Sequence, residues 1–477
     1  MRGGITSGVV YPLAVVELSK RYRFHNIGGT SAGALAAVVT AAAEYGRDHG
    51  GFDRIAALPQ ELAGSLLDKF QPHADARPLF RLLLAAVSGR KAVLIGTLLV
   101  QYWLGALVGA VPGLAVIAFA WFGSGSWVFA LIGLAVALLG AVAGAAIAAL
   151  RHAKAALPSW DYGLCSGRTQ PGGTGPGLTD WLADTIDRVA GRPLDGPPLG
   201  IADLGGEDIV VSTVTTDLTT HRPYSLPIEN NLHFFSEAEF RRLFPARVVD
   251  FMIAGSSKVE DEDAQVAGAP KDLYYFQMEN TPLVVLARLS LSFPGLISGV
   301  PLWRVDYTLK NPGPEGRIVR CLFSDGGLSS NFPVHFFDAL LPHRPTFGIS
   351  LGQYDERRGK RVFLPLEARR GQLSADTAFR RSRRFCHGDR RQRQGLAGFA
   401  AIHPARLSRA HRDRKPAPRR GWPEPGNAGR ADQRPHAPGR RGRAAAHRFP
   451  VRRASVAALP GRGQGGRRYA APVRASL

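Results

Sequence analysis

The stretch Asn26–Gly46, NIGGTSAGALAAVVTAAAEYG, places a serine among small residues directly before an alanine-rich run. The segment from about Tyr22 to Ile27 predicts a short β-strand, and the run from about Ala32 to Tyr45 predicts an α-helix. A further helix is expected earlier, from about Val9 to Lys20. Helices and strands that alternate at this spacing indicate a layered α/β fold.

The serine lies in a G-x-S-x-G pattern formed by Gly29, Thr30, Ser31, Ala32 and Gly33. A turn from strand to helix that exposes a serine hydroxyl crowds its neighbours, so glycine is needed two residues away on each side. The helix that follows directs free N–H groups and its positive dipole end towards the serine. Two interpretations remain open: a nucleophile on a sharp turn, or a glycine loop before a buried helix.

A serine nucleophile needs a base within hydrogen-bonding distance. None of the histidines before residue 371 stands in a distinctive loop, and His221 and His335 are the least implausible among them. The motif SDGG at Ser324–Gly327 is a better source of a base, because Asp325 ends an apolar run. Gly326 and Gly327 then let the backbone turn closely beside this carboxylate, although an ordinary Asp-Gly turn has the same sequence.

Near the N-terminus, the segment RGGITSG at Arg2–Gly8 contains a pair of glycines, Gly3 and Gly4. Glycine N–H groups can approach the oxyanion of an acyl-transfer reaction without steric cost. Taken alone, a glycine pair is equally typical of a generic turn.

The glycine turn, the serine motif and the late DGG motif, in this order, resemble the patatin-like phospholipases. The block LARLSLSFPGLISGVPLW at Leu286–Trp303 is similar to the Ser-Phe-Pro segment of that family, and VSTVTTDLTT at Val211–Thr220 is similar to its central strand. The resemblance extends over about Gly3–Leu351. It implies a three-layer patatin-like α/β fold with a central, mostly parallel sheet.

The resemblance also implies a Ser-Asp dyad that cleaves carboxylic esters of phospholipids or lysophospholipids through an acyl-enzyme. Ser31 would be the nucleophile and Asp325 the base, with Gly3, Gly4 and Ala32 supplying N–H groups to the oxyanion hole. No metal and no cofactor is required. The first loop departs from the family pattern, because Arg2 precedes two glycines rather than three, and no strand is expected before it.

The segment Ala92–Leu150 contains no charged residue in 59 positions. A membrane-spanning helix needs about 20 apolar residues, so two spans are predicted near Val93–Trp121 and Trp127–Leu150. Gly123–Ser126 would form the turn, and Pro112 would kink or break the first span. A buried helical hairpin in a soluble core is the alternative.

Basic residues flank this segment on both sides, at Arg90–Lys91 and Arg151–Lys154. The positive-inside rule therefore predicts that both ends lie in the cytoplasm, which requires an even number of crossings. Ser31 and Asp325 would then share one compartment. We expect a multi-pass membrane protein with a cytoplasmic catalytic domain and a membrane lipid as its substrate.

Four regions follow: residues 1–91 and 151–365 as the two parts of the catalytic domain, 92–150 as the hairpin, and 371–477 as a tail. Strands are expected at Asp208–Thr216, at Leu283–Leu289 and before the segment Cys321–Val334, and Thr346–Leu351 closes the ordered pattern. Three cysteines without metal-site spacing argue against a disulfide scaffold or a zinc module.

The tail explains the net charge of +22, because it holds 26 of the 60 Lys and Arg residues and 5 of the 38 Asp and Glu residues. The preceding 370 residues are almost neutral, so no specific nucleic-acid partner is expected. The tail composition fits either a disordered RNA- or lipid-binding arm or translation out of frame. Three alternatives therefore stay open: a non-enzymatic membrane scaffold with a degenerate patatin fold, a nucleic-acid-binding protein acting through the tail, and a hydrolase with a Ser-His-Asp triad. The oligomeric state is not predicted.

Overall fold

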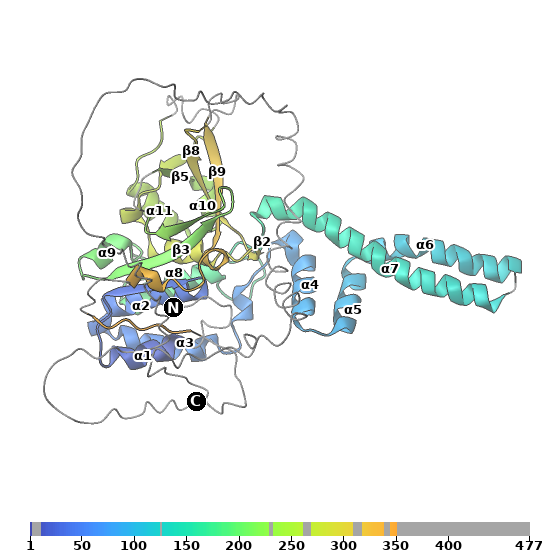
Figure 1. Cartoon of the computed structure of the whole chain (residues 1–477), viewed down its shortest axis with the longest axis horizontal. Coiled ribbons are helices and arrows are strands. Elements are labelled where there is room, and N and C mark those ends of the chain that lie inside the picture. The colour runs from blue at the N-terminus through green and yellow to red at the C-terminus, as the bar shows by residue number, and fades with distance from the viewer. Residues whose placement is uncertain are drawn as a thin grey trace, which may run out of the picture. The chain divides into compact units, whose positions relative to one another are not determined.

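The computed structural model describes residues 1, 11–124, 126–228, 232–260, 269–308, 317–337 and 344–350 (Figure 1). The strands in these residues are β1 Asn26–Thr30, β2 Gly163–Cys165, β3 Val210–Asp217, β4 Arg222–Leu226, β5 His233–Ser236, β6 Leu273–Tyr275, β7 Gly295–Ile297, β8 Val300–Val305 and β9 Ile318–Asp325. The helices are α1 Tyr11–Ser19, α2 Ala32–Tyr45, α3 Gly51–Leu62, α4 Arg77–Val87, α5 Lys91–Gln101, α6 Trp103–Phe119, α7 Trp127–Ala156, α8 Leu178–Ala190, α9 Ile201–Gly205, α10 Glu237–Arg241, α11 Ala246–Ala254 and α12 Leu283–Leu291.

The main sheet has the strand order β1-β3-β9-β8-β5-β6, and β4 also pairs with β3. Among the described strands of this sheet, β1 and β3 pair in parallel and all other pairs are antiparallel. The expected mostly parallel sheet is therefore wrong, whereas the mixed α/β class is confirmed. Antiparallel neighbours need no crossover helix, and a tight turn at 218–221 connects β3 directly to β4. A second, two-stranded sheet pairs β2 with β7 in parallel.

Helices α2 and α12 cover one face of the main sheet, where α2 contacts β1 and β3 and α12 contacts β3 and β9. Helix α8 packs on both, and α3 packs on α2 and α8. Consequently α2 and α12 lie between the sheet and an outer helix layer. This position explains why α12 has no polar face, with every residue from Leu283 to Ser290 buried.

The helix expected at Ala32–Tyr45 is confirmed as α2, and the strand before it lies a few residues later than expected, at Asn26–Thr30. Helix α1 occupies Tyr11–Ser19 of the expected helix. The strand expected at Leu283–Leu289 is wrong, because these residues form helix α12. A fully buried apolar run has neither the period of an amphipathic helix nor the alternation of a half-buried strand.

The first apolar span is divided at Tyr102, where the backbone has φ −123° and ψ 42°. Helix α5 ends there and α6 begins at Trp103, so the expected span from Val93 is too long. Pro112 lies inside α6 without ending it. A π-helical turn extends α6 through Ser124, so helical geometry reaches into the predicted turn. The segments Trp103–Gly123 and Trp127–Trp160 are long and apolar enough to cross a membrane.

Glycines allow α6 and α7 to pack backbone to backbone. A Cβ atom on Gly109 would overlap the carbonyl group of Gly140, and one on Gly144 would overlap the carbonyl group of Gly105. Small residues at helix interfaces are typical of membrane helix pairs, where close packing replaces the hydrophobic effect. Large apolar side chains on the outer surface remain exposed, including Val108 at 73% and Leu139 at 73%.

Candidate active site

Ser31 lies between β1 and α2 in a backbone conformation that few residues other than glycine adopt, with φ 57° and ψ −126°. Such strain is concentrated at functional sites, where the surrounding structure holds it in place. Gly29 is required by the same turn, because a Cβ atom there would overlap the backbone of Gly33. The structure therefore gives a steric reason for the first glycine of the G-x-S-x-G pattern.

The side chain of Ser31 points to Asp325. The Ser31 hydroxyl donates a hydrogen bond to Oδ2 of Asp325 at 2.6 Å, and the N–H group of Gly327 donates to Oδ1 at 2.5 Å. Ser31 and Asp325 are both buried, at 7% and 3% exposure. Gly326 is needed beside the carboxylate, because a Cβ atom there would overlap the carbonyl group of Val214. The structure thus brings together two predicted residues that are 294 positions apart.

Strand pairing explains this convergence. Residues 210–214 of β3 pair with β1, and residues 215–217 pair with β9. Strand β4 pairs with residues 213–217 and thus overlaps both partners, so it occupies the opposite edge of β3. Strands β1 and β9 therefore meet end to end on one edge of β3. Ser31 directly follows β1 and Asp325 is the last residue of β9, so both lie at the meeting point.

Burial raises the pKa of the Asp325 carboxyl, and the hydrogen bonds from Ser31 and Gly327 offset only part of this effect. Removing a carboxylate from water disfavours its charged form and makes it a stronger base. This is the change that proton transfer from a serine hydroxyl requires, since an ordinary aspartate is a weak base. The geometry and the electrostatics of the pair are therefore both suited to general-base chemistry.

The two histidines singled out from the sequence lie in other environments. His221 is on the turn between β3 and β4 with φ 57°, and the ring of His335 packs against Phe336. The hydrogen bond from the Ser31 hydroxyl goes to a carboxylate rather than to an imidazole.

Of the groups predicted for an oxyanion hole, Gly3 and Gly4 lie outside the described residues. Ala32 is the first residue of α2, and its N–H group has no acceptor within the helix. The carbonyl group of Ser31 accepts from the N–H groups of Ala34 and Leu35, while the N–H group of Ser31 donates to the Ser290 hydroxyl at 3.1 Å. The N–H group of Ser31 is therefore occupied, and the N–H group of Ala32 is the donor next to Ser31.

Three residues at the end of α12 support the pair and were not predicted. Ser290 holds the N–H group of Ser31, as described above. The carbonyl group of Ser292 accepts the N–H group of Asp325 at 3.0 Å and the Ser324 hydroxyl at 2.7 Å. Ser292 is held in turn by Arg288, which donates from Nη1 to its hydroxyl at 2.5 Å.

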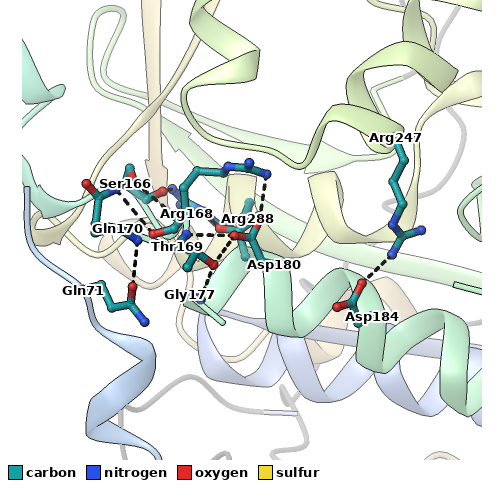
Figure 2. A network of polar contacts seen from close by, with 11 residues as sticks. Gln71, Ser166, Arg168, Thr169, Gln170, Gly177, Asp180, Asp184, Arg247 and Arg288 are labelled. Atoms are coloured by element: carbon teal, nitrogen blue, oxygen red, sulfur yellow. Dashed lines mark hydrogen bonds and ion pairs between the residues drawn. The ribbon is translucent and has the colours of Figure 1, made fainter. Parts of the chain in front are cut away.

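Arg288 is fully buried, and its hydrogen-bond acceptors among the described residues are neutral. Its Nε group donates to the hydroxyl of Thr179, and Nη2 donates to the carbonyl groups of Ser166 and Ser298. Burial lowers the pKa of Arg288 to about 10, so the side chain remains charged at neutral pH. Figure 2 shows Arg288 in the wider polar network at the start of α8, where Arg168 pairs with Asp180.

A protein of Rhizobium meliloti (strain 1021) named RpoH suppressor is 35% identical to the chain over 449 residues. This similarity covers 78% of the chain and 69% of that relative. The chain belongs to the RpoH suppressor family. No family model matches the sequence, and no solved structure matches it.

In this member of the RpoH suppressor family, the arrangement offers a hydroxyl, a buried carboxylate that accepts its hydrogen bond, and a helix N-terminus beside the hydroxyl. Such an arrangement can remove the proton from the serine hydroxyl and can stabilise an anion that forms next to it. In the part of the chain that the structure describes, no group of three or more His, Cys, Asp or Glu residues could hold a metal ion.

Proposed function

We propose that the chain is a membrane-anchored serine lipid acyl hydrolase with a patatin-like fold, acting on phospholipids or lysophospholipids. The observation that carries the proposal is the 2.6 Å hydrogen bond from the strained Ser31 to the buried Asp325. The antiparallel β3–β9 pair carries Asp325 to Ser31 and differs from the parallel sheet expected for that fold, so the proposal rests on the dyad geometry rather than on the sheet.

In the proposed reaction, Oγ of Ser31 attacks the ester carbonyl carbon while its proton passes to Oδ2 of Asp325. The N–H group of Ala32, together with those of Gly3 and Gly4, stabilises the oxyanion of the tetrahedral intermediate. As the intermediate collapses, Asp325 returns the proton to the leaving alcohol and an acyl-Ser31 ester remains. Asp325 then takes a proton from a water molecule while the water oxygen attacks the acyl carbon. The bond from this carbon to Oγ breaks, Asp325 returns the proton to Oγ of Ser31, and the fatty acid is released.

The hairpin supports a membrane substrate. Two apolar helices with exposed large side chains and glycine contacts are suited to lipid rather than water as their surroundings. We place both basic flanks in the cytoplasm, so that the hairpin anchors a cytoplasmic catalytic domain at the bilayer surface. The protein would then be a multi-pass membrane protein that meets its substrate at the interface.

Labelling with a fluorophosphonate probe tests the proposal, since this reagent reacts with activated serines. The full chain in detergent should be labelled and Ser31→Ala should not. The control Ser65→Ala, at a half-buried serine whose hydroxyl donates to the carbonyl group of Glu61, should be labelled like the wild type. Release of fatty acid from phosphatidylcholine micelles should follow the same pattern. Labelling that persists in Ser31→Ala would exclude this nucleophile, and an unlabelled, correctly folded wild type would favour the scaffold alternative.

A further inference from the structure

Helices α4 and α5 pack against each other as an antiparallel pair with a groove between them. The groove has a volume of about 630 Å³, within the range of ~300–1,000 Å³ usual for small-molecule sites. Its lining is mostly apolar, with Leu84, Val93 and Val100 among its side chains. Arg81 and Gln101 lie together at one end, joined by a contact of 3.5 Å between Nη1 and Oε1.

This groove lies next to the proposed membrane segment. Helix α5 ends where α6 begins, and the intervening Tyr102 contacts His152 of α7 at 2.9 Å. Helix α5 also contacts α7, and Figure 1 shows the α4–α5 pair running across the direction of α6 and α7. A helix pair that crosses the spans in this way lies along the bilayer surface when α6 and α7 cross the bilayer.

All charged residues in this part of the chain are basic. From Ala76 to Trp160 the sequence contains no Asp or Glu, while six basic residues flank the apolar segment. These are Arg77, Arg81, Arg90, Lys91, Arg151 and Lys154. Clusters of four to eight basic residues beside membrane spans attract anionic lipids, each contributing about 1 kcal/mol near the surface.

We propose that the groove between α4 and α5 binds one phospholipid with an anionic headgroup. An acyl chain lies against Leu84, Val93 and Val100, and the headgroup phosphate lies at the end formed by Arg81 and Gln101. The occupant is a lipid of the bilayer, because the apolar lining and the cationic end match the two halves of such a molecule. Through the α4–α5 pair, the site would hold the catalytic domain at anionic regions of the membrane.

This inference rests on the membrane placement proposed above, and it is independent of the hydrolase chemistry. It is therefore tested in the Ser31→Ala background, where the bound lipid cannot be cleaved by the proposed nucleophile. If the hydrolase proposal is wrong, lipid turnover will be unchanged in Ser31→Ala. If the lipid-binding proposal is wrong, lipid retention will be unchanged when the groove is filled.

The experiment measures retained lipid by native mass spectrometry. The full chain is equilibrated in nanodiscs of phosphatidylcholine with or without phosphatidylglycerol and then transferred to detergent. One phosphatidylglycerol molecule should be retained per chain. Equal retention of phosphatidylcholine would overturn the recognition of an anionic headgroup.

Gly96 provides a variant that fills the groove. It lines the groove, and a Cβ atom on it would meet nothing within 4 Å, so Gly96→Leu adds a side chain there without a backbone clash. Gly205 at the end of α9 has the same open surroundings, which makes Gly205→Leu the matched control. Gly96→Leu should lose the retained lipid and Gly205→Leu should keep it.

Arg81→Gln tests the cationic end while leaving the apolar lining unchanged. Affinity for phosphatidylglycerol should fall about fivefold, the effect expected for one cation near an anionic lipid. Resistance of each variant to carbonate extraction from membranes shows that the hairpin is still inserted. Retention of phosphatidylglycerol at the wild-type level in an inserted Gly96→Leu protein would show that the lipid binds elsewhere and would overturn the proposal.

Discussion

Asp325 is buried as a carboxylate, which makes it a better base and a costly residue for the fold. Asparagine has nearly the same shape but neither accepts a proton nor carries a charge. We expect Asp325→Asn to lower the turnover of a short-chain ester by about 10²–10⁴-fold, the usual contribution of a general base. The unfolding temperature should be unchanged or higher, because a buried charge has been removed. Ester hydrolysis and thermal unfolding measure the two effects, with the exposed Asp195→Asn as control; full activity in Asp325→Asn would eliminate this residue as the base.

The pH dependence of catalysis follows from the raised pKa of Asp325. Only the ionised carboxylate accepts the proton of Ser31, so kcat/KM should fall as the pH drops through this pKa. The acid limb should therefore lie above ~4, the pKa of an unperturbed aspartate. If the acid limb of the kcat/KM profile is lost in His221→Ala or His335→Ala, the base is a histidine instead.

The same shift links Asp325 to stability. The carboxyl ionises at a lower pH in the unfolded chain than in the folded one, so the folded state binds more protons between the two pKa values. The contribution of Asp325 to stability therefore decreases as pH rises through this window. Across the acid range, the unfolding temperature of Asp325→Asn should rise relative to that of the wild type as the pH increases.

Arg288 acts through Ser292 and is a positioning residue in the proposed mechanism. Lysine keeps the charge but cannot reproduce a planar fork that reaches Thr179, Ser292 and Ser166 at once. Arg288→Lys should therefore slow labelling by fluorophosphonate per folded molecule, with kcat reduced more than KM is changed. Arg168→Lys alters the same network without reaching Ser292 and should label normally. A lower unfolding temperature with a normal labelling rate in Arg288→Lys would mean that the role of Arg288 is structural alone.

At the scale of the secondary-structure element, local chemistry predicted some features and failed for others. Helix α2 was predicted with its correct ends, because the turn at Ser31 and the glycine at Gly46 mark them in the sequence. Helix α12 was mistaken for a strand because its neighbours bury all its sides. The helix breaks at Tyr102, where the sequence has neither glycine nor proline to predict a break. Proline usually ends or kinks a helix, yet α6 continues through Pro112.

The packing of α6 on α7 depends on glycines that are matched across the hairpin. In Gly109→Ala the added methyl group would overlap the carbonyl group of Gly140, so the helices must separate, whereas Gly96→Ala on α5 meets no neighbour. We expect Gly109→Ala to destabilise the hairpin by about 1–3 kcal/mol, the usual cost of overpacking. Thermal unfolding in detergent, with Gly96→Ala as the helical glycine control, measures this difference; equal unfolding temperatures would mean that the helices do not pack through Gly109.

At the scale of the whole molecule, the candidate site depends on contacts that no local pattern encodes. Ser31 and Asp325 were identified from their own motifs, but their meeting results from β1 and β9 sharing one edge of β3. The partners Arg288 and Ser290 lie on α12 and Ser292 follows it directly, so their roles depend on where that helix packs. Parallel or antiparallel pairing is likewise a property of the assembled sheet rather than of any strand.

The chain passes through the α6–α7 hairpin between Ser31 and Asp325, so the proposed membrane topology and the proposed dyad constrain each other. If α6 and α7 cross a membrane as proposed, the hydrogen bond from the Ser31 hydroxyl to Asp325 requires both ends of the hairpin to lie on one side of it. Single cysteines at Lys91 and Lys154 should therefore resist a membrane-impermeant maleimide in intact spheroplasts, while a cysteine at Gly123 should react. All three should react after lysis. Cys386 is replaced by serine in every variant, and the buried native Cys165 and Cys321 should add little background. If the reagent instead reaches one flank but not the other, the segment crosses an odd number of times. The two residues could then not form a dyad in the membrane-inserted protein.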